Sequence, residues 1–190
     1  MLRFDNVACI RGGRRLFEGL SFKLEPGGAA LVSGPNGVGK SSLIRVAAGL
    51  LPPAAGRVAA SGARALLTEA TALDDDLSLA DALLFWARLD RSDVAAAVDG
   101  ALTALALGEL AEMPVRLLST GQRRRAAFAR VLASGMPIWL LDEPANGLDA
   151  EAVERLATAM AGHRAAGGIV LVASHLPIGL PAARQIALGK

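Results

Sequence analysis

Residues 34–41 constrain this chain more than any other segment, because they fit the pattern G-x-x-x-x-G-K-[ST] in full. The apolar run at residues 29–33 predicts a buried strand ahead of them, and the helical spacing of residues 42–50 predicts a helix behind them. A strand, a glycine-rich loop and a helix in this order are the context in which the pattern marks a phosphate-binding loop. The candidate nucleotide-binding residues are Gly34, Pro35, Asn36, Gly37, Val38, Gly39, Lys40, Ser41 and Ser42.

The chemistry of this loop follows from its residue types. Gly34, Gly37 and Gly39 allow the backbone to turn back with its N–H groups facing inward, which forms a concave site for an anion. The helix that begins near Lys40 directs its positive dipole end to the same place. Lys40 can reach the β- and γ-phosphates of a nucleotide, and the Ser41 hydroxyl can bind Mg²⁺. An ordinary glycine-rich turn is the alternative, and the Lys-Ser pair in register disfavours it.

The composition indicates one soluble domain, or one core with a small subdomain. The 190 residues are 53% hydrophobic with a mean hydropathy of +0.41. No uninterrupted apolar run approaches the roughly 18 to 20 residues that a membrane-spanning helix needs. The longer candidates, such as residues 131–141, reach about half that length. Alanine and leucine on amphipathic helices therefore account for the high hydrophobic content.

Charge and cysteine content exclude several other classes. Lys and Arg number 20 against 18 Asp and Glu, and a net charge of only +2 gives little reason to expect a nucleic acid partner. Cys9 is the only cysteine, so neither a disulfide framework nor a thiol metal cluster is expected. The first residues do not form a signal peptide, and we expect a mature, cytoplasmic N-terminus.

Several segments with strand patterns surround the phosphate loop. Residues 2–9 and 20–24 alternate in hydrophobicity, and Gly-rich turns follow them. They predict a small antiparallel sheet that leans on the nucleotide-binding core. Further short strands are predicted at residues 57–60, 64–67, 138–143 and 168–173.

The middle third of the chain is predicted to be helical. Residues 77–89, 94–107 and 122–133 form the three expected helices, with Ser78 and Ser92 as N-caps of the first two. Both flanks of this region alternate strand and helix. The sequence therefore predicts an α/β core that carries an all-helical insert.

Two carboxylates follow the apolar strand at residues 138–141. A carboxylate at the carboxyl end of a parallel strand lies at the edge where such sheets bind ligands. Asp142 is the natural partner for a Mg²⁺ that Ser41 contacts. Glu143 can be aimed at a water in line with the γ-phosphate, which makes it the candidate general base.

Residues 118–122, Leu-Ser-Thr-Gly-Gln, precede three consecutive arginines, Arg123, Arg124 and Arg125. Ser119 and Gly121 at a helix start offer a hydroxyl and an unobstructed backbone N–H to an anion. The simpler interpretation, favoured from this segment alone, is an ordinary N-cap followed by a solvated basic face.

His175 comes just after the strand predicted at residues 168–173. A single histidine is most often a surface or core residue without a catalytic role. This one stands past a strand end, at the edge predicted for Asp142 and Glu143. We therefore expect it to sense the γ-phosphate.

Taken together, these motifs resemble one family, the nucleotide-binding subunits of ABC transporters. Residues 34–41 match its Walker A loop, 118–122 its signature loop, 140–143 its Walker B motif and 147–149 its D-loop, while His175 matches its switch histidine. The motifs occur in family order and span nearly the whole chain. The resemblance implies an α/β fold: an ABC-type P-loop NTPase core, a small N-terminal antiparallel β subdomain and an α-helical insert near residues 70–135, in one domain over 1–190.

The resemblance also implies how such a domain works. It binds ATP and Mg²⁺, and it pairs head to tail with a second copy, with ATP between the Walker A loop of one copy and the signature loop of the other. Ser119 and Gly121 would then contact the γ-phosphate in trans, which replaces the simple N-cap interpretation. Closure around ATP and reopening after hydrolysis would drive integral membrane subunits between conformations.

Two positions depart from the family pattern. An aromatic residue usually stacks on adenine ahead of the Walker A loop, and the matching position is Arg11, which can stack as a cation–π plane. The usual glutamine of the Q-loop is replaced by Glu69, a carboxylate that could still meet Mg²⁺ or water.

The short stretch between residues 53 and 66, together with the segments at residues 16–22, 122–125 and 167–170, is similar to one subfamily: the ATP-binding subunit of the bacterial haem exporter of cytochrome c maturation. This similarity implies a peripheral protein on the cytoplasmic face of the inner membrane, with cytochrome c maturation subunits as partners. We expect no direct haem binding, because His163 is predicted on a helix surface and Cys9 in the first sheet. Residues 73–86 are the expected docking surface, and Leu79 and Phe85 are its test positions.

Other functions remain as alternatives. The same motor could serve another cargo, such as a lipid, a peptide or a drug. A soluble ABC ATPase of DNA repair or translation belongs to a different class, and such proteins usually carry tandem cassettes, coiled-coil insertions or basic arms. The intact Glu143 and His175 disfavour a binding-only module, and no Asn-Lys-x-Asp motif indicates a GTPase.

Overall fold

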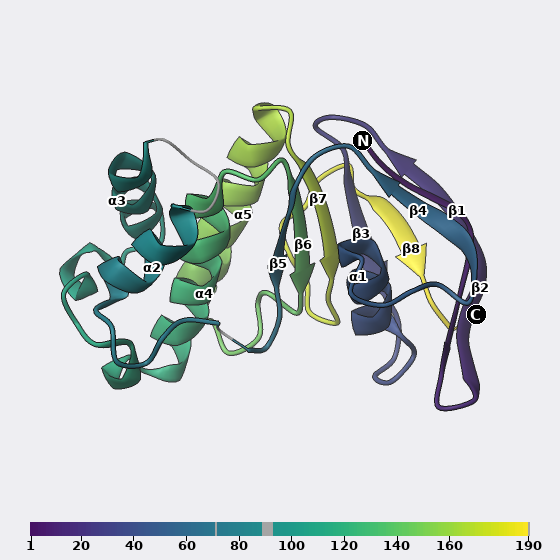
Figure 1. The fold of residues 1–190 in the computed structure, drawn as a ribbon, viewed down its shortest axis with the longest axis horizontal. Coiled ribbons are helices and arrows are strands. Elements are labelled where there is room, and N and C mark those ends of the chain that lie inside the picture. The colour runs from purple at the N-terminus through teal and green to yellow at the C-terminus, as the bar shows by residue number, and fades with distance from the viewer. Residues whose placement is uncertain (71, 89–92, 190) are drawn as a thin grey trace.

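A five-stranded parallel sheet forms the centre of the fold, and its strands come from distant parts of the chain. The computed structural model describes residues 1–70, 72–88 and 93–189 (Figure 1). The strand order is β5-β6-β7-β3-β8 and every neighbouring pair is parallel. The strands are β3 (Ala29–Ser33), β5 (Arg64–Leu67), β6 (Ile138–Asp142), β7 (Ile169–Ala173) and β8 (Arg184–Ala187).

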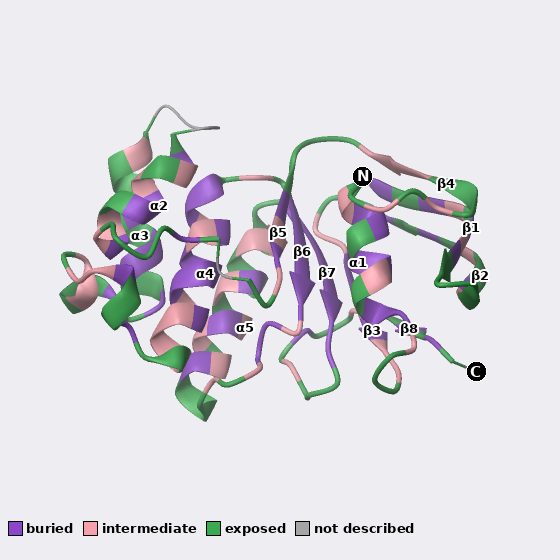
Figure 2. Cartoon of the chain, turned by 60° about the horizontal axis from the view of Figure 1, so that its bottom comes forward, coloured by how far each residue is buried: buried purple, intermediate pink, exposed green. Residues whose placement is uncertain are grey.

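Strands β6 and β7, inside the sheet, are buried along their whole length, which explains their continuous apolar sequence (Figure 2). Successive side chains point to opposite faces of the sheet. On β6, Trp139 and Leu141 belong to the core on one face, and Ile138 and Leu140 belong to the core on the other. The sheet therefore separates two hydrophobic cores.

One core lies between the parallel sheet, helix α1 (Lys40–Ala48) and a second sheet (Figure 1). The second sheet is antiparallel with the order β2-β1-β4, as the sequence predicts for its first two strands. Phe4 and Phe22 stack across it with ring centroids 4.4 Å apart, and Cys9 is buried in the same core, as expected. The strands are β1 (Leu2–Arg11), β2 (Arg14–Leu24) and β4 (Ala55–Ala60).

Helices lie on the opposite side of the parallel sheet. They are α2 (Leu79–Ala87), α3 (Val94–Ala104), α4 (Thr120–Ser134) and α5 (Ala150–Ala165), with two short 3₁₀ turns at Gly108–Leu110 and Val115–Leu117. Helices α4 and α5 contact the strands, whereas α2 and α3 pack on α4. The Ser78 hydroxyl accepts a hydrogen bond from the Asp81 N–H and caps α2, as predicted. The predicted cap at Ser92 and the predicted end of the first helix at Leu89 lie outside the described residues.

The expectation that Leu79 marks an exposed docking surface is wrong. Leu79, Ala82 and Leu83 recur at helical spacing on α2, and all three are buried in the core beneath the helix. Phe85 lies on the other face of α2 and is 57% exposed. A charge at Leu79 would therefore disrupt the core, whereas a charge at Phe85 tests the surface.

His163 is a second correction, because it does not lie free on a helix surface. Its ring stacks on the Trp139 ring with centroids 3.8 Å apart and planes within 7°. Its Nε2 atom is buried and has no hydrogen-bond partner among the described residues. A Cβ at Gly168 would overlap the imidazole, so the stack requires glycine there. Burial lowers the pKa of His163, and backbone hydrogen bonding opposes it.

This buried imidazole predicts a loss of stability in mild acid. Below pH 6.5, the ordinary pKa of histidine, His163 binds a proton in the unfolded chain but stays neutral in the folded chain. The free energy of unfolding therefore falls as the pH drops through that value. We expect His163→Phe, which keeps a flat ring on Trp139, to reduce this fall. The slope for one proton is at most about 1.4 kcal/mol per pH unit. Denaturant unfolding of both proteins at several pH values between 7 and 5 measures it, and parallel pH dependences would contradict the prediction.

Among the residues that the structure describes, no helix is long and apolar enough to cross a bilayer.

Candidate functional site

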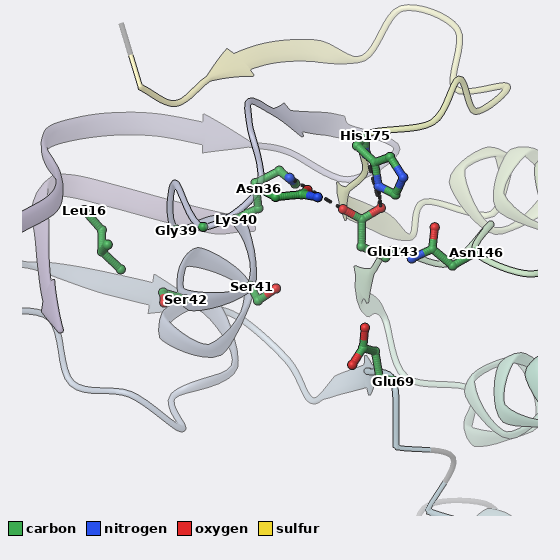
Figure 3. Close-up of a pocket in the computed structure, with 11 residues that line it drawn as sticks. Leu16, Asn36, Gly39, Lys40, Ser41, Ser42, Glu69, Glu143, Asn146 and His175 are labelled. Atoms are coloured by element: carbon green, nitrogen blue, oxygen red, sulfur yellow. Dashed lines mark hydrogen bonds and ion pairs between the residues drawn. The ribbon is translucent and has the colours of Figure 1, made fainter. Parts of the chain in front are cut away.

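A cavity of about 350 Å³ opens at the carboxyl edge of the parallel sheet, beside the N-terminus of α1 (Figure 3). Its lining comes from β2, the phosphate loop, the segment after β5 and the ends of β6 and β7. This is where parallel sheets place ligand sites. The lining residues are Leu16, Asn36, Gly37, Gly39, Lys40, Ser41, Ser42, Glu69, Glu143, Asn146 and His175.

The phosphate loop has a backbone that only glycine adopts easily. Gly34, Gly37 and Gly39 have φ angles of 145°, 77° and 116°. A Cβ at Gly34 would lie 2.6 Å from the carbonyl oxygen of Leu188, and one at Gly39 would lie 2.9 Å from Leu16 Cβ. No side chain of the described residues caps the N-terminus of α1, which begins at this loop. The loop and the helix dipole therefore fit an anion such as a nucleotide phosphate.

Lys40 lies inside this loop and is only 6% exposed. Its Nζ atom donates to the carbonyl oxygens of Gly34 at 3.0 Å and Pro35 at 3.4 Å, and it is 3.6 Å from Glu143 Oε1. An ammonium group at a glycine-rich helix start suits the terminal phosphates of a nucleotide. The loop and the carboxylate of Glu143 are thus connected through one positive charge.

Ser41 and Asp142 meet although 101 residues separate them in the chain. The Ser41 hydroxyl donates to Asp142 Oδ1 at 3.0 Å. Burial raises the pKa of Asp142, the Ser41 hydrogen bond opposes this, and the nearby carboxylates of Glu143 and Glu69 add to it. Oxygen donors of this kind suit Mg²⁺, which keeps several waters and binds through one or two protein oxygens and substrate phosphates. The pair fits such an ion.

Glu143 points into the cavity from the residue just after β6. Its backbone is left-handed with φ 49°, and its N–H donates to the carbonyl oxygen of Ala173 at 2.8 Å. Its Oε2 atom is 2.8 Å from His175 Nδ1 and accepts a hydrogen bond from the His175 backbone N–H at 3.1 Å (Figure 3). The carboxylate therefore sits between Lys40 and His175 and faces the space beside the phosphate loop.

Glu69 and Arg11, the two residues that depart from the family pattern, lie in different places relative to the cavity. Glu69 lines the cavity, whereas Arg11 pairs with Arg14 at the end of the β1–β2 hairpin and is not part of the lining. Leu16 on β2 and Asn146 after β6 also line the cavity, and neither is predicted from the sequence. The alternation of β2 does not distinguish Leu16 from its neighbours, and Asn146 adjoins the D-loop without belonging to it.

Ser119 and Gly121 lie away from the cavity of their own chain. Ser119 is the N-cap of α4: its hydroxyl accepts from the Gln122 N–H, and Gln122 Oε1 accepts from the Ser119 N–H at 2.8 Å. Ser119 is thus an N-cap within its own chain, and its contact with a phosphate in trans stays a prediction. The solvated basic face is wrong for Arg124, which is only 8% exposed because its side chain turns towards the ends of β5 and β6.

Comparison with known proteins agrees with this geometry. The family model described as ABC transporter matches residues 17–146. The cytochrome c biogenesis ATP-binding export protein CcmA of Sphingopyxis alaskensis is 59% identical over 100% of this chain and 97% of its own length. The protein of the same name from Novosphingobium aromaticivorans is 51% identical over 96% of this chain and 93% of its own.

The fold is shared more widely. An ABC transporter ATP-binding protein from Pyrococcus furiosus superposes with a TM-score of 0.85, covering 98% of this chain and 96% of that one at 22% identity. The resemblance in the motifs, the family match and the close relatives agree. The chain belongs to the ABC transporter family as an ATP-binding, ATP-hydrolysing subunit, and within it to the cytochrome c biogenesis ATP-binding export proteins.

Proposed function

We propose that this chain is the ATP-hydrolysing motor of a membrane complex that exports haem or releases it from its chaperone in cytochrome c biogenesis. The observation that carries the catalytic part is the carboxylate of Glu143, held between Lys40 and His175 beside the phosphate loop. The relatives' names, which specify cytochrome c biogenesis and ATP-binding export, support the cargo assignment. In this complex the subunit lies on the cytoplasmic face of the bacterial inner membrane.

In this proposal the phosphate loop binds the triphosphate of ATP through the N–H groups at the start of α1 and through Lys40. The Ser41 hydroxyl and Asp142 would hold Mg²⁺, which would supply positive charge to the phosphate oxygens. Glu69 lines the same cavity and can bind a water of that ion. Leu16 borders the loop, and Arg11 remains a proposed contact for the adenine ring of ATP.

Glu143 acts as the general base and orients the attacking water. Its Oε2 is held by two hydrogen bonds from His175, which fixes the direction of the carboxylate. Its Oε1 faces Lys40 at 3.6 Å. When the Lys40 ammonium turns to a phosphate, Oε1 becomes free to accept the proton of the water. Lys40 therefore links the carboxylate to the arrival of the nucleotide, while His175 keeps its direction fixed.

Two copies of the chain are required for a complete site in this proposal. Ser119 is exposed and lies outside the cavity of its own chain, so only a second copy can bring it to the phosphate. Gly121 stands near the carbonyl oxygen of Gly147, where a Cβ would be 3.5 Å from that oxygen. The helix dipole of α4 adds a favourable field for an anion at Ser119 and Gly121.

The helical subdomain, about residues 70–135, is the proposed docking surface for the membrane subunits. Phe85 is 57% exposed and borders a cavity of about 180 Å³ with Leu77 and Trp86. The Trp86 ring lies edge-on to Phe85 with centroids 5.7 Å apart, and its Nε1 donates to the carbonyl oxygen of Ala72. An exposed phenylalanine beside a half-buried tryptophan suits an apolar segment of a membrane partner.

Phe85→Asp is expected to release the subunit from membranes, because a charge on this surface opposes burial against an apolar partner. Membrane fractionation of the tagged protein in its host measures the bound share. Ile10→Asp is the matched control, since Ile10 is 52% exposed on the antiparallel sheet. Retention of Phe85→Asp at the level of Ile10→Asp would show that the docking surface lies elsewhere.

Capture in the native host tests the function. Tagged Glu143→Gln is expected to retain ATP and the closed dimer, and its partners after detergent extraction can be identified by mass spectrometry. Small integral membrane subunits together with cytochrome c maturation proteins would support the haem assignment. A different permease would keep the motor and change the cargo. Recovery without any membrane protein would favour the soluble ATPase.

A further inference from the structure

The middle arginine of the run 123–125 differs from its two neighbours. Arg123 and Arg125 are partly exposed and donate to groups of the helical region. Their acceptors are the Asp75 carboxylate and the backbone oxygens of Leu105, Ala106, Arg116 and Leu118. Arg124 instead extends from α4 into the core and is 8% exposed. The phosphate site as described above leaves this buried cation without a role.

Arg124 connects the helical insert to two strand ends. Its Nη1 donates to the carbonyl oxygen of Thr68 at 2.9 Å, directly before Glu69. Its Nη2 donates to the carbonyl oxygens of Asp142, at 3.1 Å, and of Glu143. One guanidinium thus holds the backbone just before Glu69 and the backbone of both Asp142 and Glu143. The planar fork of arginine suits such a bridge, whereas the single ammonium of lysine does not.

The backbone at Glu143 depends on such support. A non-glycine residue in the left-handed region is strained, and Glu143 has φ 49°. Its N–H is held by Ala173, and its carbonyl oxygen accepts hydrogen bonds from Arg124 and from the Asn146 N–H. The direction of the Glu143 side chain towards His175 follows from this backbone conformation. Loss of one support would allow the peptide to relax and the carboxylate to turn away.

The Arg124 guanidinium also interacts with the negative charges of the site. The carboxylates of Glu69, Asp142 and Glu143 all lie near enough to the Arg124 guanidinium to raise its pKa against the larger lowering effect of burial. The guanidinium therefore places a fixed positive charge behind three acidic residues of the site. It does so from α4, the helix that begins at the proposed phosphate-contacting residue Ser119.

We propose that Arg124 is a positioning residue for hydrolysis. It holds the backbone of Asp142 and Glu143 against α4, so the position of this helix, which Ser119 caps, determines the direction of the Glu143 side chain. This inference rests on the proposed role of Glu143 as the base. Movement of α4 when a second copy contributes Ser119 would then be transmitted through one side chain to the carboxylate. ATP binding itself does not use Arg124, because no atom of it lines the cavity.

Arg124→Gln in the full chain, assembled with its membrane subunits, tests the proposal. We expect kcat to fall about 10- to 100-fold, the range for a misplaced catalytic group, with KM for ATP changed by less than about 3-fold. Arg125→Gln is the matched control, since it removes a guanidinium from the same helix. Within the described part of the chain, that guanidinium donates only to the carbonyl oxygens of Leu105 and Ala106 in the helical insert. Equal losses of kcat in both variants would mean that only the stability of the helix matters, and would overturn the proposal.

Two further variants separate positioning from charge and from folding. Arg124→Lys keeps the charge but not the fork, and we expect it to remain impaired; full recovery would overturn the bridging role. Adding Arg124→Gln to Glu143→Gln should lower turnover no further, because the two residues act in one step, and equilibrium binding of ATP should match that of Glu143→Gln. An additional loss of turnover or of binding would refute action through Glu143. If Glu143→Gln alone kept normal turnover, the base assignment would fail first.

Discussion

Glu143→Gln is expected to lower ATP turnover about 100- to 10,000-fold, which is the contribution of a positioned general base. The glutamine amide keeps the shape of the side chain but cannot accept the proton of the attacking water. His175 and Lys40 hold the carboxylate within reach of the cavity, so the loss follows from chemistry rather than from misplacement. Steady-state phosphate release by the assembled complex measures turnover. ATP affinity, measured by equilibrium binding, should not weaken.

Glu151→Gln is the matched control for this substitution. Glu151 is an exposed carboxylate on α5 that pairs with Arg155 one helical turn away, so the same chemical change there removes only a surface ion pair. Turnover of that variant should stay within about 2-fold of the unsubstituted protein. A Glu143→Gln protein that hydrolyses ATP as fast as the control would assign the base to another group of the cavity.

The phosphate loop shows how far local sequence predicts the fold. The glycines, Lys40 and the flanking apolar runs predicted β3, the loop and α1 with errors of no more than about two residues at the helix ends. The reason is physical: only glycine adopts the φ angles of the loop, and a buried parallel strand needs continuous apolar sequence. The pairing of Ser41 with Asp142 followed from the rule that parallel strands present ligands at their carboxyl edge.

Two elements, α5 and β8, were not predicted. Helix α5 buries Ala152, Leu156 and Met160 at a spacing of four, but its alanine-rich surface weakens the contrast between its faces. β8 has four residues with only Ile186 buried, so its pattern is no stronger than that of a loop. Such short segments become strands because a neighbouring strand is already there to pair with them.

The errors at single residues have a common cause. The sequence pattern predicts Leu79, Arg124 and His163 at the surface, yet each one turns towards the core of the protein. Periodicity within one helix does not say which partner lies opposite, and the stack of His163 on Trp139 depends on a strand 24 residues earlier in the sequence. Charged and polar types are usually exposed, so a buried arginine that donates to three carbonyl oxygens is recognisable only in the fold.

Lys40→Met is expected to weaken ATP binding about 30- to 150-fold, because a charge-assisted hydrogen bond to a phosphate is worth roughly 2–3 kcal/mol. Methionine has nearly the same length and volume but no charge. The side chain is 6% exposed, so its neighbours stay in contact with apolar atoms after the change. Isothermal titration of the purified protein with ATP and Mg²⁺ gives the dissociation constant directly.

Folding stability should respond much less than ATP affinity to Lys40→Met. The substitution removes the hydrogen bonds to Gly34 and Pro35 and the 3.6 Å contact with Glu143, but it also removes the desolvation cost of a buried ammonium. Lys23→Met, at a lysine whose side chain is 49% exposed and paired with Glu25, is the control and should bind ATP normally. Equal ATP affinity in the two variants would show that the Lys40 ammonium supports the loop rather than the phosphates. A large loss of stability together with affinity would instead make the lysine part of the fold of the loop, and the phosphate contact would then rest on the backbone N–H groups alone.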